Sequence, residues 1–144
     1  MRGLFPVWAA ALVFTALSFL SACNRAEAGS PEGVADAFCD AYFRQADQEK
    51  AKQFTAFGAT KMLNDELREV RSVREGGYTP KDAQLEVAIE RGDRTARGDR
   101  VRFDYVIRYE DQVKHADIEL AKVHDDWKVV RVGLSRADSE SAGR

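Results

Sequence analysis

The pattern of apolar and polar positions divides the chain into three parts. Residues 4 to 20 form a nearly continuous apolar run, and no acidic residue precedes Glu27. Residues 31 to 75 repeat their apolar positions every three to four residues, which is the period of an amphipathic helix. Beyond Pro80 apolar and polar positions alternate, which is the period of a half-buried strand. The pattern therefore predicts helices first and strands afterwards.

Three helices are expected in the first part of the folded region. Ser30 can cap the first helix with its hydroxyl, and Pro31 tolerates the first helical position. Asp47 can cap the second helix, and Gly58 interrupts the pattern before the third. The helices are predicted over residues 31–45, 47–57 and 59–75. Their apolar faces are Val34, Phe38, Ala41 and Tyr42, then Ala51 and Phe54, then Leu63, Leu67 and Val70.

Four strands are expected after Pro80, separated by short connections that favour an antiparallel meander. The predicted turns carry Gly92-Asp93, Gly98-Asp99, Glu110-Asp111 and Asp125-Asp126. The apolar positions are Leu85, Val87 and Ile89, then Val101, Phe103, Tyr105, Ile107 and Tyr109, then Ala116, Ile118 and Leu120, and finally residues 127–134. Helices followed by four strands in series predict an α+β domain, with helices covering one face of a curved antiparallel sheet.

The apolar run at the start is typical of a secretory leader. Arg2 supplies a positive charge, and the small residues Ser21 and Ala22 end the run. A membrane-spanning helix needs about 20 apolar residues, so the run is borderline in length for one. Leu20-Ser21-Ala22-Cys23 resembles the lipobox of bacterial lipoproteins, in which a small residue precedes an invariant cysteine. An uncleaved membrane anchor and an ordinary secreted protein are the alternatives.

The lipobox resemblance implies a lipid anchor on Cys23. In that family the leader is cut before the cysteine, here between Ala22 and Cys23, the thiol receives a diacylglyceryl group, and the new amine is acylated. Each buried methylene contributes about 0.8 kcal/mol, so two or three acyl chains hold a protein on its membrane. Aspartate after the cysteine favours retention at the inner membrane in this family, but Asn24 stands there. The resemblance therefore implies the periplasmic face of the outer membrane if the host has two membranes.

Cleavage would leave 122 of the 144 residues, which is enough for one domain with its own core. We expect a signal peptide over 1–22, a lipidated tether over 23–30, the α+β domain over 31–134 and a disordered tail over 135–144. The seven steps from Cys23 to Ser30 span at most about 25 Å, which keeps the domain close to its membrane. The net charge moves from −2 to −3 without the leader, and acids and bases are interleaved, so nucleic acid is not expected as a partner.

Lipidation of Cys23 would leave Cys39 without a cysteine partner in the chain. No internal disulfide can then form. No base or cation is placed nearby to activate the thiol, so we expect Cys39 to be a small core residue on a helix.

The predicted domain resembles a second family. The helix pair with Phe38 and Phe54, the aromatic strand from Val101 to Tyr109 and the closing Trp127-Lys128-Val129-Val130 are similar to cone-shaped nuclear transport factor 2-like domains. Small bacterial lipoproteins of unassigned function belong to that superfamily. Cystatin-like domains, in which a sheet wraps around a helix, are the alternative. The resemblance implies a cone that can hold a small apolar ligand.

Some members of this superfamily are isomerases or dehydratases that use an acid, a histidine or a tyrosine inside the cone. Tyr105, Tyr109 and His115 are the polar residues that we expect on the inward side, where they would face a ligand. Catalysis would need a side chain that transfers a proton inside a cavity that excludes water. It would also need an acidic residue on the same inward face to complete the site. Asp104, the obvious carboxylate, alternates outward. Aromatic residues at alternating strand positions are more often core, so no catalytic residue is assigned.

Two other motifs are interpreted as turns. His124-Asp125-Asp126 places an imidazole beside two carboxylates, but adjacent residues rarely converge on a metal without further ligands. Arg-Gly-Asp occurs at residues 91–93 and 97–99, where glycine-aspartate suits a hairpin connection better than an adhesion site. We expect neither a metal nor another cofactor.

The sequence therefore predicts a membrane-anchored lipoprotein whose domain is a non-catalytic binding module of the cell envelope. Its partner would be an envelope protein or a small apolar molecule. A small cone-fold enzyme acting on an apolar molecule, and a scaffold subunit of an envelope assembly, are the alternative functions. A filled core would favour the binding module, and a cavity with a buried titratable group would favour the enzyme.

Overall fold

The computed structural model describes residues 27–76 and 86–136. Within these two ranges, four helical segments precede four strands: α1 (Pro31–Cys39), the π-helix η1 (Asp40–Arg44), α2 (Gln48–Lys52), α3 (Phe57–Glu75), β1 (Ala88–Arg97), β2 (Arg100–Arg108), β3 (Val113–Val123) and β4 (Asp126–Arg136). The strands form one antiparallel sheet in the order β1-β2-β3-β4. The predicted α+β class and the meander are confirmed.

Local capping chemistry starts the first helices where the sequence predicts. The Ser30 hydroxyl accepts a hydrogen bond from the Gly33 amide at 3.0 Å, and Pro31 occupies the first helical position. The Asp47 carboxylate likewise accepts from the Lys50 amide at 3.0 Å at the start of α2. Both caps satisfy amide groups that a helix leaves unpaired at its first turn.

The boundary between α2 and α3 differs from the prediction. α2 ends at Lys52 rather than Phe57, because residues 54–56 make a short parallel bridge to β4 instead of continuing the helix. The Val129 amide donates to the Phe54 carbonyl, and the Ala56 amide donates to the Val129 carbonyl, both at 2.9 Å. Gly58 does not interrupt a helix but lies inside α3, where a β-carbon would stand 3.2 Å from the Val130 carbonyl oxygen. The glycine therefore allows α3 to approach β4 closely.

The connection between β1 and β2 also differs. Gly92-Asp93 is not a turn: β1 runs through it, and a bulge between Arg91 and Arg94 absorbs the extra residue. Gly98 does form the predicted turn, with a φ of +61° that glycine adopts without steric cost. The β3–β4 hairpin turns at His124 and Asp125, which both have positive φ. β4 extends to Arg136, two residues beyond the predicted domain end.

One face of the sheet is buried and the other is open to solvent. On β2 the buried positions alternate with exposed ones, except that Val106 on the outer face is half-buried. The fully buried large side chains are Phe38, Leu63, Phe103, Tyr105, Ile107, Ile118, Leu120 and Val129. Cys39 is also completely buried, which confirms the prediction that it is a core residue.

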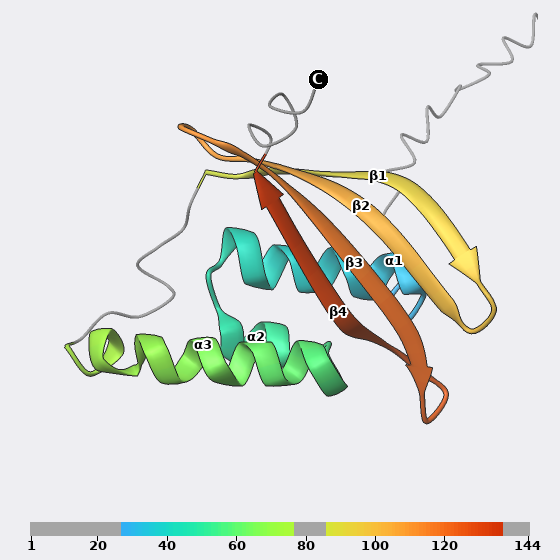
Figure 1. Cartoon of the computed structure of the whole chain (residues 1–144), viewed down its shortest axis with the longest axis horizontal. Helices are drawn as coiled ribbons and strands as arrows, with labels where there is room; N and C mark the ends of the chain where they lie inside the picture. The colour runs from blue at the N-terminus through green and yellow to red at the C-terminus, as the bar shows by residue number, and fades with distance from the viewer. Residues whose placement is uncertain (1–26, 77–85, 137–144) are drawn as a thin grey trace, which may run out of the picture.

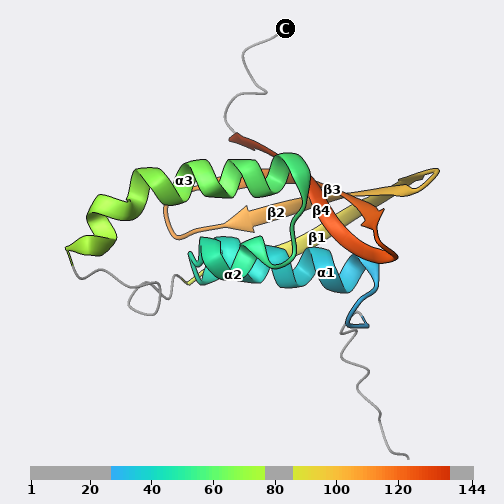
Figure 2. The same ribbon diagram turned by 90° about the horizontal axis from the view of Figure 1, so that it is seen from below.

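The helices leave the two sheet edges in different environments. α1 packs mainly on β3 and β4, while α3 begins beside β4 and contacts α2 (Figure 1). Viewed from below, α3 runs alongside α1 and α2 and projects beyond the strands at its C-terminal end (Figure 2). β1 forms the opposite edge and exposes nearly all of its side chains.

Candidate functional site

The space between α1 and the sheet is filled with side chains. Phe103, Tyr105 and Ile107 each expose at most 1% of their surface, and their neighbours across the sheet and on the helix are equally buried. Phe38 stacks on Tyr42 with ring centroids 5.5 Å apart, which continues the packing along α1 into η1. A ligand in the middle of this domain would have to displace core residues.

A hollow of about 460 Å³ lies beside this core, between the α1–η1 segment and β1. Its lining residues are Asp36, Asp40, Arg44, Ile89, Arg91 and Tyr105. We call it the helix–edge groove. Asp40 and Arg44 stand at the two ends of η1 and pair with each other. Single-turn π-helices often occur at functional sites, because the wider turn redirects side chains.

An ion network spans the helix–edge groove. Asp36 of α1 accepts a hydrogen bond from the Tyr105 hydroxyl and another from the Arg91 guanidinium, both at 2.7 Å. A second bridge joins Arg94 to Glu32 at 3.0 Å. Burial raises the pKa of the Tyr105 phenol well above its usual range, and the nearby Cys39 and Asp36 raise it further. Tyr105 is therefore a neutral hydrogen-bond donor at physiological pH.

A second hollow of about 710 Å³ continues from the first, and Arg44 lines both. Its other lining residues are Glu86, Val87, Ala88, Arg108, Tyr109 and Glu110. Burial raises the pKa of Tyr109, and the Lys114 ammonium lies 5.2 Å from its ring centroid. Nearby, Tyr42 donates a hydrogen bond to Glu66 at 2.7 Å. We call the two hollows together the charged channel: the first lies on the inner side of β1, and the second lies where β1 begins and β2 ends.

The structure brings two of the three predicted ligand-facing residues to this channel. Tyr105 lines the first hollow and Tyr109 the second. The prediction for His115 is wrong: it is exposed on the outer face, opposite Val106 and Ser135. The strand register explains this, because Tyr105 pairs with Ala116, and the residue before Ala116 must point to the other face.

His115 lies instead in a shallow hollow of about 390 Å³ on the outer face. Gly133 leaves room there, and Asp104 and Asp117 oppose each other across the strands. Arg102 bridges them, at 2.5 Å from Asp117 and 3.6 Å from Asp104. The outward orientation predicted for Asp104 is confirmed, and both carboxylates serve a cross-strand ion network.

The charged residues of the channel were missed by sequence reasoning, and three of them show why. Asp36, Arg44 and Arg91 are charged side chains in two helical segments and a strand. The sequence pattern around them is that of ordinary solvent-exposed positions. Asp36 and Arg91 are 55 residues apart, so no local pattern links them. The available signal was that Asp36 lies one turn before Asp40 and two turns before Arg44, which puts three charges along one side of the first helical segment.

The burial of Cys39 also lowers the reactivity of its thiol. Burial raises the pKa of its thiol, and the carboxylates of Asp36 and Asp40 raise it further. The thiolate, which is the nucleophilic form, is therefore disfavoured. The predicted cleavage and lipidation residues, Ala22 and Cys23, lie outside the described residues.

Among the residues that the structure describes, no three histidine, cysteine or acidic side chains converge on a position that could hold a metal ion. No helix within residues 27–76 or 86–136 is long and apolar enough to cross a membrane.

Comparison with known proteins gives only distant likenesses. No family model matches the chain, and no curated protein matches it. A de novo designed β-sheet protein, solved by NMR in solution, is 15% identical with a TM-score of 0.35, covering 56% of this chain and 93% of its own. The protein Bd1075 of Bdellovibrio bacteriovorus is 11% identical with a TM-score of 0.44, covering 74% of this chain and 39% of its own.

Proposed function

We propose that this chain is a lipid-anchored lipoprotein of the cell envelope whose α+β domain is a non-catalytic binding module. The filled core carries this proposal. Phe103, Tyr105 and Ile107 occupy the space in which a cone-shaped enzyme would hold its substrate. The hollows that remain are open and charged, and they lie at the side of the sheet.

The titratable groups of the channel also favour binding over catalysis. A general base must be able to take a proton at physiological pH. The raised pKa of Tyr105 opposes ionisation, and its hydroxyl is already committed to Asp36. Asp36 in turn is bound to Arg91. These groups hold α1 to the sheet and present fixed charges at the surface.

The chemistry of the channel favours a protein partner over a small apolar molecule. Its walls carry both charge signs, from Arg44, Arg91 and Arg108 and from Asp36, Asp40 and Glu86. An extended polypeptide segment with both charge signs can pair with such a surface, whereas an apolar molecule would remove these ions from water at a cost. Tyr105 and Tyr109 supply the aromatic surface that protein interfaces favour.

The anchor and the fold family complete the proposal. Lipid on Cys23 would hold the domain near a bilayer, at the periplasmic face of the outer membrane in a host with two membranes. The nuclear transport factor 2-like family remains the proposed class, and the cystatin-like family remains the alternative. The element order, helices followed by a four-stranded meander, supports this assignment.

Photo-crosslinking in cells tests the partner. A photoreactive amino acid at Arg44, which lines both hollows, should capture a specific envelope protein. The same amino acid at His115, exposed on the outer face, is the matched control and should not capture that protein. Equal capture at both positions would contradict the channel as the binding surface, and a small apolar molecule retained in native mass spectra would contradict the protein partner. Intact-mass measurement of the purified chain tests the anchor separately, by the mass of the acyl groups on Cys23.

A further inference from the structure

β1 is a sheet edge that nothing covers within the described residues. It pairs with β2 on one side, and no described element pairs with it on the other. α1 packs mainly on β3 and β4 and reaches β1 through the ion pairs of Asp36 and Glu32, so it does not cover the outer edge of the strand (Figure 1). An uncovered edge of ten residues presents unpaired amide and carbonyl groups to any strand that fits beside it.

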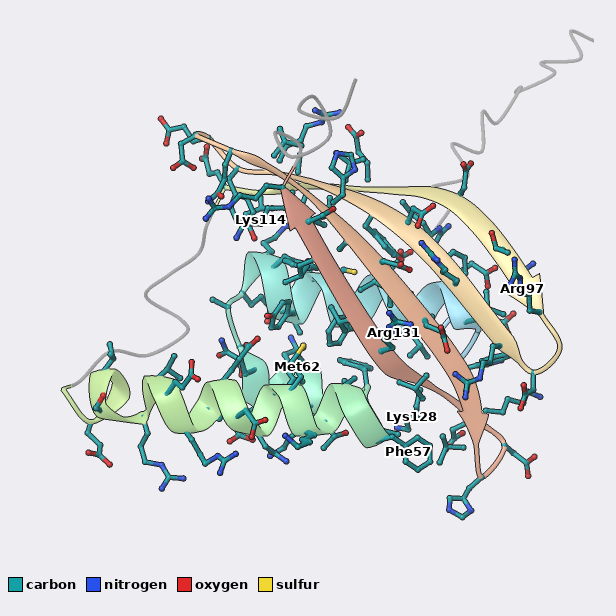
Figure 3. All side chains as sticks on the ribbon, in the orientation of Figure 1. Phe57, Met62, Arg97, Lys114, Lys128 and Arg131 are labelled. Carbon is teal, nitrogen blue, oxygen red and sulfur yellow. The ribbon has the colours of Figure 1, made fainter. Side chains whose placement is uncertain are left out.

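The charges of β1 restrict which strand can fit. The strand carries Glu90, Arg91, Asp93, Arg94 and Arg97 and contains the bulge, and such features usually deter edge pairing. Arg91 and Arg94 are bound to α1, and Glu90 approaches Arg108 at 3.6 Å. Asp93 and Arg97 make no ion pair with any described residue, and Figure 3 shows Arg97 near the hairpin end of β1. Only a strand with complementary charges would be accepted.

We propose that this strand is β1 of a second copy of the chain, paired antiparallel about a two-fold axis between Asp93 and Arg94. In this register Glu90 of each copy faces Arg97 of the other, and Asp93 of each copy lies beside Arg94 of the other. Opposite charges directly across an antiparallel pair stabilise it, and the symmetry repeats each contact. The smaller positions also fit, because Arg91 faces Ala96 and Gly92 faces Thr95.

The bulge makes this register sterically consistent. Residues directly opposite each other in an antiparallel pair must point to the same face. Glu90 and Arg97 are seven positions apart, so in a regular strand they would point to opposite faces. The bulge between Arg91 and Arg94 shifts the alternation by one residue. Glu90 then pairs with Val106 and Arg97 with Arg100, and both partners lie on the same outer face of β2.

The resulting dimer would join two four-stranded sheets into one, with the helices of both copies on the same side. The channel remains accessible from the helix side. The pairing is inferred from the exposed edge and the charges of β1. It does not depend on a lipid anchor or on the partner proposed for the channel. Anchoring would raise the local concentration of the chains and favour the dimer further.

Charge reversal across the proposed pair tests the inference. The full chain, purified in detergent, is labelled with donor or acceptor dyes, and energy transfer is measured over a dilution series. The variants are Arg97→Glu, Glu90→Arg and the double variant, with Arg71→Glu as a control of equal charge change on the exposed surface of α3. Thermal melting verifies that each variant is folded. If a charge-reversal variant does not fold, the neutral variant Arg97→Gln or Glu90→Gln replaces it.

We expect each reversal to weaken the dimer about tenfold, because two symmetric attractions become repulsions. The double variant should return to within about threefold of the original affinity, since each pair is restored in the opposite sense. The Arg71→Glu control should dimerise like the unchanged chain. Three results would each overturn the proposal. The unchanged chain could stay monomeric at the highest concentration reached, the charge reversals could leave the affinity unchanged, or the double variant could dimerise as weakly as the single variants.

Discussion

Replacing Tyr105 by phenylalanine isolates the hydrogen bond that joins β2 to α1. Tyr105 exposes 1% of its surface, and its hydroxyl donates to Asp36 at 2.7 Å. Phenylalanine keeps the ring, so the change leaves no large cavity and removes mainly the hydroxyl. A hydrogen bond to a charged group contributes about 1.5 to 3 kcal/mol. The Asp36 side chain is 43% exposed, so water replaces part of that interaction, and we expect a loss of about 1.5 kcal/mol at pH 7.

The pH dependence of that loss is the sharper test. The pKa of Tyr105 is raised in the folded state, whereas an unfolded tyrosine ionises near pH 10. Below about pH 10 both states keep the proton, and the contribution of Tyr105 to stability is fully present. Above that pH the unfolded state loses its proton first, so the stability of the unchanged chain falls by up to about 1.4 kcal/mol per pH unit.

The Tyr105→Phe variant lacks this ionisation, and every other titrating group is common to both proteins. The stability difference should therefore stay constant from pH 6 to 9 and close near pH 11. Urea unfolding followed by circular dichroism measures it at each pH. A variant as stable as the unchanged chain at pH 7, or a difference that persists undiminished at pH 11, would refute the assigned hydrogen bond and burial.

Three further predictions concern the core and the turns. Ile107→Ala should destabilise the domain by about 2 to 5 kcal/mol in urea unfolding, because Ile107 is fully buried. Val106→Ala, on the other face of β2, should lower the stability much less. Equal losses would contradict the orientation of the strand. Gly98→Ala should lower stability by about 1 to 2 kcal/mol in thermal melting because its φ is +61°, and an unchanged melting temperature would argue against this turn. Cys39 should resist maleimide in the native chain and react in urea, as mapped by mass spectrometry; native labelling would show that its burial is wrong.

The features that sequence reasoning recovered depend on neighbouring residues. The caps at Ser30 and Asp47 need only a side chain and the next turn of backbone. The inward positions of Phe103 and Ile107 follow from alternation within one strand. Gly98 marks its turn because few other residues accept its backbone geometry.

The features that it missed depend on partners distant in the sequence. Gly92-Asp93 carries the same turn signal as Gly98-Asp99, but pairing with β2 converts it into a bulge. The bridge at residues 54–56 exists because β4 supplies the hydrogen-bonding groups. His115 is different, because it directly precedes the alternating apolar positions Ala116, Ile118 and Leu120, so the local pattern already places it on the outer face, and the register against β2 agrees. The channel network joins a helix and strands that no local pattern connects.

The short bridge between residues 54–56 and β4 has a consequence for assembly. A sheet with two accessible edges can add molecules at both sides and grow without limit into a fibre. Here the Phe54 and Ala56 backbone already occupies the groups of Val129 along β4. This segment of the β4 edge is therefore closed to another strand, whereas no described segment bridges β1 in the same way, so the two edges are not equivalent sites for strand-to-strand growth.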